Sequence, residues 1–230
     1  MSRGKLFVIA TPIGNLSDMT FRAVETLKRC SLIACEDTRI SSHLLRHFSI
    51  SAPLIAYHDR NEREQVNFLI KKIEEGGEIA IICDAGTPTI SDPGFRIVRE
   101  CKKNDIDVVP IPGASAMIAA LSASGLPTHC FFFLGFPGHR ASARIKILEQ
   151  YAAAGGTLVC YESCHRLEKF LHDIAHVYGL ERVISIGKEL TKIHETIVTA
   201  PVGEVLLNVK KMITIKGEFV VLVAPARYTL

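Results

Sequence analysis

Short apolar runs alternate with amphipathic stretches along the whole chain. The runs at residues 78–83 and 106–111 are almost continuously apolar, which is typical of parallel strands that are buried on both faces. Residues 62–75, by contrast, place apolar side chains three and four positions apart, as an amphipathic helix does. Because strands that alternate with helices favour βαβ units, the pattern predicts an α/β fold.

The same pattern divides the chain into two halves. In the first half we expect strands at residues 6–10, 31–35, 53–57, 78–83 and 106–111, and helices at 20–29, 41–47, 62–75 and 94–103. The helix at 20–29 should bury Phe21, Val24 and Leu27. In the second half we expect strands at 130–134, 157–161, 182–186, 193–199 and 218–223, and helices at 114–124, 140–154, 165–176 and 202–209. Longer charged loops favour a mixed sheet in the second half, against a mostly parallel sheet in the first. A break near residues 112–125 predicts two lobes, 1–112 and 113–230.

The composition, with 48% apolar and 22% charged residues, is that of an ordinary globular protein and excludes a disordered chain. No apolar run reaches the roughly 18 residues of a membrane helix. The apolar stretch at residues 6–10 is too short for a signal peptide. The seven cysteines are an odd number and lie among apolar residues, which favours reduced, buried thiols. We therefore expect a cytoplasmic protein with no membrane segment.

The formal net charge is +3, and all of the excess lies in the second half. Residues 1–112 hold 15 basic and 15 acidic side chains, whereas residues 113–230 hold 12 and 9. Such a surplus is compatible with binding a polyanion without implying it, and a solvated surface explains it equally.

The sequence lacks the usual nucleotide-binding and hydrolase signatures. It has no G-x-G-x-x-G after the first expected strand, no G-x-x-x-x-G-K-[ST] and no G-x-S-x-G. Cys160, Cys164 and His165 are metal ligands by type, but a C-x₃-C without a second pair is a weak signature. We expect no metal site, and neither a dehydrogenase, a P-loop enzyme nor a hydrolase.

Polar turns rich in Gly and Pro follow the expected strands, at the end where open α/β sheets bind ligands. The turns are Thr11-Pro12-Ile13-Gly14-Asn15-Leu16, Cys35-Glu36-Asp37-Thr38-Arg39, Asp84-Ala85-Gly86-Thr87-Pro88, Ser91-Asp92-Pro93-Gly94, Pro112-Gly113-Ala114-Ser115, Tyr161-Glu162-Ser163-Cys164-His165-Arg166 and Glu189-Leu190-Thr191-Lys192. So many turns at one edge predict a binding cleft.

Each turn has a functional and an ordinary interpretation. Asp84 can accept hydrogen bonds from ribose hydroxyls or an ammonium, and Gly86 lets the backbone approach a ligand, but both residues also suit a plain turn. Ser115 opens a helix whose first N–H groups attract a carboxylate or phosphate, or it is a simple cap.

Two further turns carry charged side chains with the same ambiguity. Glu36-Asp37 is either a base candidate or an acidic cluster paired with Arg39. Residues 161–166 combine an aromatic ring, an acid, an imidazole and a guanidinium, or they cap the strand with Arg166 pairing Glu162.

Taken together, these motifs resemble the ribosomal RNA small subunit methyltransferase I family, which belongs to the tetrapyrrole methylase superfamily. They occur in order over residues 6–224 and are Thr11-Pro12-Ile13-Gly14-Asn15-Leu16, Glu36-Asp37-Thr38-Arg39, Asp84-Ala85-Gly86-Thr87-Pro88, Ser91-Asp92-Pro93-Gly94, Tyr161-Glu162-Ser163, His165-Arg166, Glu189-Leu190-Thr191-Lys192 and Lys216-Gly217-Glu218.

The resemblance implies two α/β lobes with S-adenosylmethionine (SAM) in the cleft between them, and a homodimer. It also implies 2′-O-methylation of a cytidine in the 16S rRNA of the small ribosomal subunit, near the decoding site. Position in the motifs then suggests a substrate-facing, catalytic set comprising Glu36, Asp37, Glu162, His165, Arg166, Glu189 and Lys192. The SAM-binding set comprises Pro12, Asp84, Ala85, Gly86, Thr87, Ser115, Ala116 and Tyr161.

The sequence also departs from the family's pattern. Cys164 stands where proline is usual, and Asp59-Arg60 precedes Asn61-Glu62 where a histidine is more usual. Many relatives carry a basic C-terminal extension, so RNA affinity is expected here to come from the folded lobes, a dimer or a partner. Two other classes remain open at this stage: a C-methyltransferase of porphyrin or corrin precursors, and a non-catalytic module that binds SAM or RNA.

Overall fold

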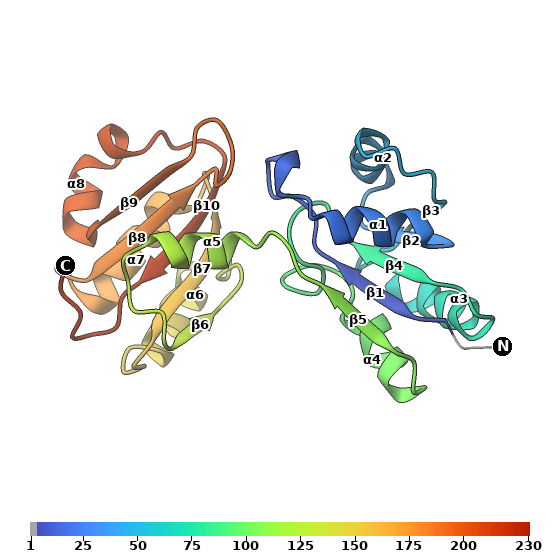
Figure 1. The fold of residues 1–230 in the computed structure, drawn as a ribbon. Helices are drawn as coiled ribbons and strands as arrows, with labels where there is room; N and C mark the ends of the chain where they lie inside the picture. The colour runs from blue at the N-terminus through green and yellow to red at the C-terminus, as the bar shows by residue number, and fades with distance from the viewer. Residues whose placement is uncertain (1–3) are drawn as a thin grey trace. The chain divides into compact units, whose positions relative to one another are not determined.

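The computed structural model describes residues 4–230, apart from the side chain of Lys210. These residues form two compact units, of which the first ends at Ser115 and the second begins at Ala116 (Figure 1). The predicted fold class is confirmed, since the first unit is built on a wholly parallel sheet and the second on a mixed one.

The first sheet has five strands in the order β3-β2-β4-β1-β5. They are β1 (Leu6–Ile9), β2 (Leu32–Cys35), β3 (Leu54–Ala56), β4 (Ile79–Ile82) and β5 (Val108–Ile111). β1 lies between β4 and β5, with Leu6 opposite both Ile79 and Val108. Because all the strands run the same way, their carboxyl ends meet at one edge of the sheet.

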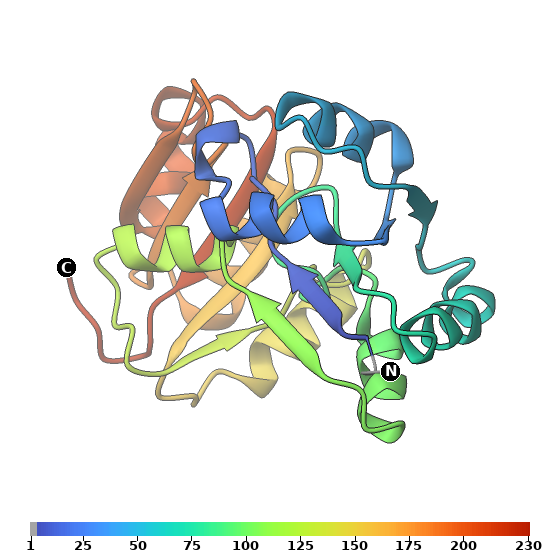
Figure 2. The same cartoon turned by 45° about the vertical axis from the view of Figure 1, so that its right-hand side comes forward.

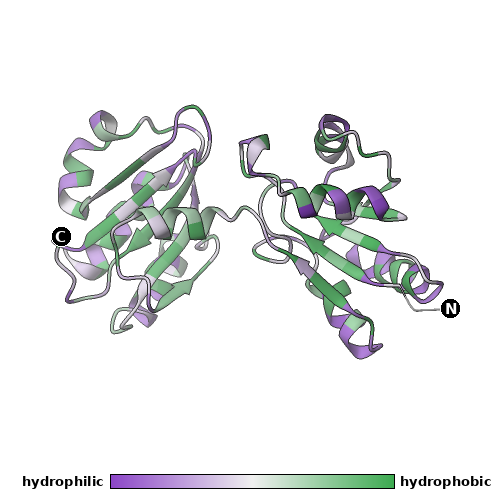
Figure 3. Ribbon diagram, viewed as in Figure 1, coloured by the Kyte–Doolittle hydropathy of each residue, from purple (hydrophilic) through white to green (hydrophobic). Residues whose placement is uncertain are grey.

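Helices cover both faces of this sheet (Figures 1 and 2). They are α1 (Phe21–Arg29), α2 (Thr38–His47), α3 (Glu62–Glu74) and α4 (Phe95–Lys103), with a short 3₁₀ turn at Leu16–Asp18. The alternation of Leu6 and Phe7 sends successive side chains into two cores, one beneath α3 and α4 and one beneath α1 and α2. Figure 3 shows the result as apolar strands between helices with polar outer faces.

One prediction for α1 is wrong. Phe21 is 91% exposed, whereas Ala23, Thr26 and Leu27 are the buried residues of this helix. At about 100° per residue those three side chains share one side, and Phe21 lies on the opposite side. Thr20 caps the helix by accepting the Ala23 N–H at 3.1 Å.

The second sheet has the order β6-β7-β10-β8-β9. Its strands are β6 (Phe131–Phe133), β7 (Thr157–Ser163), β8 (Val183–Lys188), β9 (Thr196–Pro201) and β10 (Glu218–Val223). β6 and β7 are parallel, and β10 is antiparallel to both β7 and β8. The carboxyl ends of β6, β7 and β8 therefore share an edge with the start of β10.

Three helices pack on one face of the second sheet and share its largest core (Figure 1). They are α6 (Ala141–Gln150), α7 (Leu167–Tyr178) and α8 (Val202–Met212), and α5 (Ala116–Ala123) packs against β7 and β10. No helix within residues 4–230 is long and apolar enough to cross a membrane.

Several predicted boundaries in the second unit are wrong. β7 continues to Ser163, which pairs with Glu218, so residues 161–163 are strand where the sequence suggested a turn. The predicted helix at 140–154 ends at Gln150, before the run of alanines and glycines. β9 begins at Thr196 and not at Ile193, which is 98% exposed in the preceding turn.

The prediction that all seven cysteines are buried is also wrong. Cys130 is exposed and Cys164 is half-buried, whereas the other five are buried, and all seven are free thiols. Cys130 precedes β6 and Cys164 follows β7, so both lie outside the apolar interior of the strands.

Candidate active site

At the carboxyl edge of the first sheet, hydrogen bonds hold three of the predicted turns together. Thr11 and Gly86 form a two-way backbone bridge of 2.8 and 3.0 Å, and the Thr11 hydroxyl donates to the Cys83 carbonyl at 3.0 Å. The Thr87 hydroxyl donates to the Ala114 carbonyl at 3.2 Å. The turns after β1, β4 and β5 therefore form one connected surface.

Within this surface the predicted cofactor residues differ in exposure. Pro12 and Gly86 are buried, Asp84 and Thr87 are half-buried, and Ala85 is exposed. Gly86 has φ +88°, a conformation that L residues with a side chain rarely adopt. The backbone of this turn is therefore fixed by the glycine and by the bridge to the turn after β1.

Three acids, Glu36, Asp84 and Asp92, gather beside the same turns. Burial raises the pKa of Glu36, and the charge of Asp84 adds to the effect. Burial likewise raises the pKa of Asp84, and it raises the pKa of Asp92 to about 6. The charges of Glu36 and Asp84 contribute to the shift at Asp92, so the three carboxyl groups repel one another. A positively charged ligand would relieve that repulsion.

Asp37, by contrast, is paired with the guanidinium of Arg39. Its carboxylate accepts from the Arg39 guanidinium at 2.6 and 3.1 Å and from the Arg39 N–H at 2.8 Å. These hydrogen bonds lower the pKa of Asp37 to about 2. Its own N–H donates to Asp84 at 3.1 Å. Asp37 thus caps α2 and orients Asp84, and the pairing interpretation of this turn holds for Asp37 but not for Glu36.

Glu62 is a buried carboxylate that sequence reasoning missed as a functional residue. Its Oε1 accepts from the Tyr57 hydroxyl at 3.1 Å, from the Gly94 N–H at 3.2 Å and from the Arg96 N–H at 3.3 Å. Its Oε2 pairs with the Arg96 guanidinium at 3.0 Å. Glu62 therefore caps α4 and ties α3 to the end of the turn that begins at Asp84.

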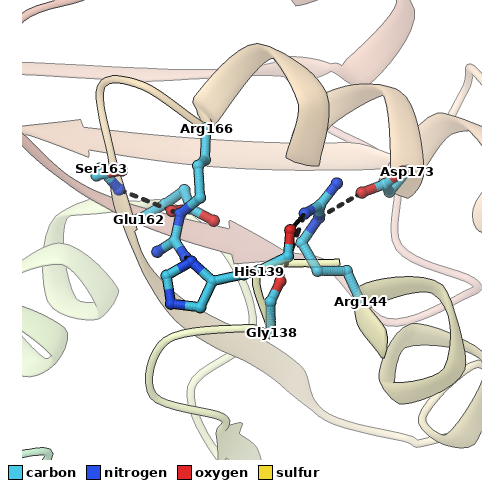
Figure 4. Close-up of polar contacts among 7 residues, drawn as sticks. All are labelled: Gly138, His139, Arg144, Glu162, Ser163, Arg166 and Asp173. Carbon is cyan, nitrogen blue, oxygen red and sulfur yellow. Dashed lines mark hydrogen bonds and ion pairs between the residues drawn. The ribbon is translucent and has the colours of Figure 1, made fainter. Parts of the chain in front are cut away.

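In the second unit, Glu162 projects from β7 into the space beside α7 (Figure 4). Its Oε1 accepts from the Arg166 guanidinium at 2.7 Å and from the Ser163 N–H at 2.8 Å. The side chain is fully buried, and its Oε2 has no hydrogen-bond partner among the described residues. The Arg166–Glu162 pair expected as one alternative is present, and Arg166 also contacts His139 Nδ1 at 3.0 Å.

Glu189 and Lys192 form a second charged group, after β8. Lys192 binds Glu189 at 3.0 Å and Glu218 at 2.9 Å, and the Glu218 N–H donates to Glu189 at 3.0 Å. This N–H and Lys192 lower the pKa of Glu189. Gly217 has φ +88°, a conformation that strains residues with a side chain, and a Cβ there would displace the Glu189 carboxylate.

The remaining predicted residues take separate places. Tyr161 lies in β7, donates its N–H to the Gly135 carbonyl at 2.8 Å and packs edge-on against Phe133. His165 is exposed in the turn before α7. Ser115 and Ala116 stand at the start of α5, on either side of the division between the two units.

The sequence reasoning assigned no role to three residues at these edges, Glu62, Asp92 and His139. For Asp92 the signal was present, since it lies within a Ser-Asp-Pro-Gly turn directly after the Asp84 turn. His139 carries no local signal because its partner Arg166 lies 27 residues away, and Glu62 carries little because, besides Tyr57, its partners lie 32 and 34 residues away. Within residues 4–230, no three His, Cys, Asp or Glu side chains are arranged to hold a metal.

Comparison with known proteins assigns the fold of this chain to a class of enzymes. The family Tetrapyrrole (Corrin/Porphyrin) Methylases matches residues 5–206. Among solved structures, diphthine synthase aligns with a TM-score of 0.73 and 14% identity, covering 96% of this chain and 89% of that one. A cobalt precorrin-4 methyltransferase aligns with a TM-score of 0.67 and 16% identity, covering 96% and 94%. At such identities these structures establish the fold alone, which is that of the tetrapyrrole methylases.

Closer relatives define the family within that class. Ribosomal RNA small subunit methyltransferase I of Escherichia coli O157:H7 is 48% identical over 96% of this chain and 78% of its own length. The protein of the same name from Synechocystis sp. is 45% identical over 97% of this chain and 80% of its own length. The chain therefore belongs to the ribosomal RNA small subunit methyltransferase I family, as its motifs predicted.

Proposed function

We propose that this protein transfers a methyl group from SAM to the 2′-hydroxyl of a cytidine in 16S rRNA, near the decoding site of the small ribosomal subunit. The observation that carries the proposal is the 48% identity to the E. coli relative over almost the whole chain. The porphyrin and corrin methylases share only the fold, at 17% identity or less.

The turns of the first unit suit SAM chemically. When bound, SAM supplies an electrophilic methyl group on a sulfonium. Asp84 is placed to accept from ribose hydroxyls or the ammonium group, while Gly86 and Thr87 offer backbone groups. Burial, and then the charges of neighbouring acids, raise the pKa values of Asp84, Glu36 and Asp92, so this acidic edge suits the sulfonium and ammonium groups of SAM. We assign Pro12, Ala85, Ser115, Ala116 and Tyr161 to the same cofactor set.

The chain's own residues must also position the ribose and handle its proton. Holding the reacting groups in line can supply about 7–11 kcal/mol, and a base or a cation near the alkoxide a further roughly 10²–10⁴-fold. Of the acids in the catalytic set, Glu36 has its pKa raised by burial and pairs with no cation among the described residues, whereas Asp37, Glu162 and Glu189 are each held by a cation. We assign proton removal to Glu36, and substrate positioning to His165, Arg166 and Lys192.

We further propose that the substrate is a small ribosomal subunit in the cytoplasm and that the protein acts as a homodimer. A net charge of +3 provides few phosphate contacts, so affinity for flexible RNA at physiological salt is expected to be weak. A folded particle presents one ribose in a fixed shape and removes the entropy cost of ordering a free strand.

The decisive experiment compares methyl transfer to small subunits from a strain that lacks this activity with transfer to small subunits from the parent strain. We expect incorporation only into the former, with mass spectrometry locating a 2′-O-methylcytidine in 16S rRNA. Methylation of a base, or incorporation into a uroporphyrinogen-type acceptor and not into RNA, would refute the proposal. Light scattering of the purified protein measures its oligomeric state.

A further inference from the structure

The loop at residues 135–140, which follows β6, exposes an aromatic ring and a guanidinium at the edge where β7 ends. Phe136 is 58% exposed although phenylalanine is usually buried, and Arg140 is exposed four residues later. Tyr161 supports the Phe136 ring edge-on at 5.5 Å between centroids. The ring therefore sits on a fixed neighbour and still presents a face to solvent.

A buried ion pair contacts the backbone of this loop (Figure 4). Arg144 of α6 pairs with Asp173 of α7 at 2.6 Å, with the two side chains only 4% and 12% exposed. The same guanidinium donates to the His139 carbonyl at 2.7 Å and lies 3.4 Å from the Gly138 carbonyl. A buried ion pair often adds little net stability to a protein. Here Arg144 of the pair also contacts two carbonyl groups of the loop, and we infer that the pair positions the loop.

A second charged pair fixes the loop at its outer end. Arg166, held by Glu162, meets the His139 ring at 3.0 Å. Two of the five N–H groups of Arg166 are used in these contacts, and the other three have no acceptor among the described residues. His165, on the adjacent turn, is exposed. The loop and this turn thus combine a rigid aromatic face with unused cationic donors.

We propose that the 135–140 loop and Arg166 form a contact surface for a single-stranded stretch of the substrate RNA. In this arrangement Phe136 stacks on an unpaired base, while Arg140 and Arg166 bind the flanking phosphates. Aromatic rings that alternate with cations are what single-stranded RNA requires, since each base offers a π face and each linkage a negative charge. This inference rests on the proposed function and adds a surface that binds the RNA.

The test measures the affinity of the full chain for a fluorescein-labelled single-stranded oligonucleotide copied from the small-subunit rRNA around the modified cytidine, starting at low salt, where a few phosphate contacts bind most strongly. Loss of one base–aromatic stack should weaken binding about 5- to 150-fold in Phe136→Ala. Phe136→Tyr keeps the ring and should bind within about twofold of the wild type. Arg140→Ala should lower the slope of log affinity against log salt by about 0.7, the value for one phosphate contact on a single strand.

The matched control is Phe68→Ala, which removes a 42%-exposed ring that also lies near a cation, Lys72, but on α3 of the first unit. It should leave RNA affinity unchanged. The thermal unfolding midpoints of Phe136→Ala and Phe136→Tyr should stay close to that of the wild type, because the Phe136 ring is 58% exposed.

The outcomes separate this inference from the proposed function. If the wild type transfers no methyl group to small-subunit RNA, the proposed function fails. If the wild type is active but Phe136→Ala binds and methylates RNA as the wild type does, the contact surface is wrong and the function stands. If Phe136→Tyr is as weak as Phe136→Ala, stacking is not the interaction, and that result also overturns the inference.

Discussion

Replacing the buried carboxylate of Glu62 should loosen the turn that leads into α4. One oxygen of Glu62 accepts three hydrogen bonds, from the Tyr57 hydroxyl and from the N–H groups of Gly94 and Arg96. Burial, followed by the charge of Glu62, raises the pKa of Tyr57, so its hydroxyl stays protonated and remains a donor. All three donors lose their acceptor together in Glu62→Ala.

The size of the effect follows from these contacts. The Tyr57 hydroxyl, in a residue that is 1% exposed, becomes a buried unsatisfied donor, which costs about 1–3 kcal/mol. Loss of the α4 cap costs about a further 0.5–2 kcal/mol. The ion pair to Arg96 adds little, because that side chain is 47% exposed. Glu62→Ala should therefore lose about 2–5 kcal/mol, and Glu62→Gln, which keeps one acceptor oxygen, only about 1 kcal/mol.

Urea unfolding of the full chain measures these free energies, with Glu64→Gln, exposed in the same first turn of α3, as the control. Because Gly94 ends the stretch that begins at Asp84, SAM affinity of Glu62→Gln should also fall a few-fold, with kcat retained at saturating SAM. A Glu62→Ala protein that unfolds at the wild-type urea concentration and binds SAM normally would refute the reasoning.

Three further predictions concern the candidate sites. Asp84→Ala or Gly86→Val should abolish SAM binding, whereas Arg166→Ala should keep SAM affinity within a few-fold and lose methyl transfer. If calorimetry gives Gly86→Val the SAM affinity of the wild type, the assignment of that turn is wrong. Burial raises the pKa of Asp92 from 3.8 to about 6, so the folded state binds its proton more tightly than the unfolded state, and stability is lost as pH rises through that range. Asp92→Asn should thus be more stable than the wild type above about pH 6 and gain nothing below about pH 4, and equal gains at both pH values in urea unfolding would contradict this. Methyl transfer should continue in the presence of a strong chelator; inhibition that zinc reverses would reveal a metal site.

The parallel sheet of the first unit was predictable because its central strands, β1, β2 and β4, are largely buried on both faces, although the edge strands β3 and β5 are only partly buried. Continuous apolar runs mark such strands with little ambiguity, and glycine and proline mark where they stop. β10 was also placed correctly, at residues 218–223. Exposed positions were harder to predict, since hydropathy gave no reason for Phe21 or Ile193 to face solvent.

The places of the candidate residues near strand ends were predictable from the same apolar runs, but the electrostatic environment of each candidate was not. Two adjacent acids, Glu36 and Asp37, look alike in the sequence, yet the pKa of Glu36 is raised and that of Asp37 is lowered to about 2. The difference arises from Arg39, which folds back onto Asp37 as α2 begins, and from burial of Glu36 beside Asp84. The sequence spacing alone does not show which of the two acids pairs with Arg39.

Contacts between residues far apart in the sequence limit more generally what the sequence alone can predict. Arg144 and Asp173 are 29 residues apart and meet only because α6 and α7 pack side by side on one face of the second sheet. Helical periodicity assigns each residue to a buried face, but it does not identify the opposite charge that makes burial tolerable. A buried arginine therefore predicts that an acid and some carbonyl groups are its hydrogen-bond partners, but only the structure identifies them. Here the carbonyls belong to Gly138 and His139, so the pair fixes the loop that carries Phe136, and a structural contact between two helices becomes a constraint on the proposed RNA surface.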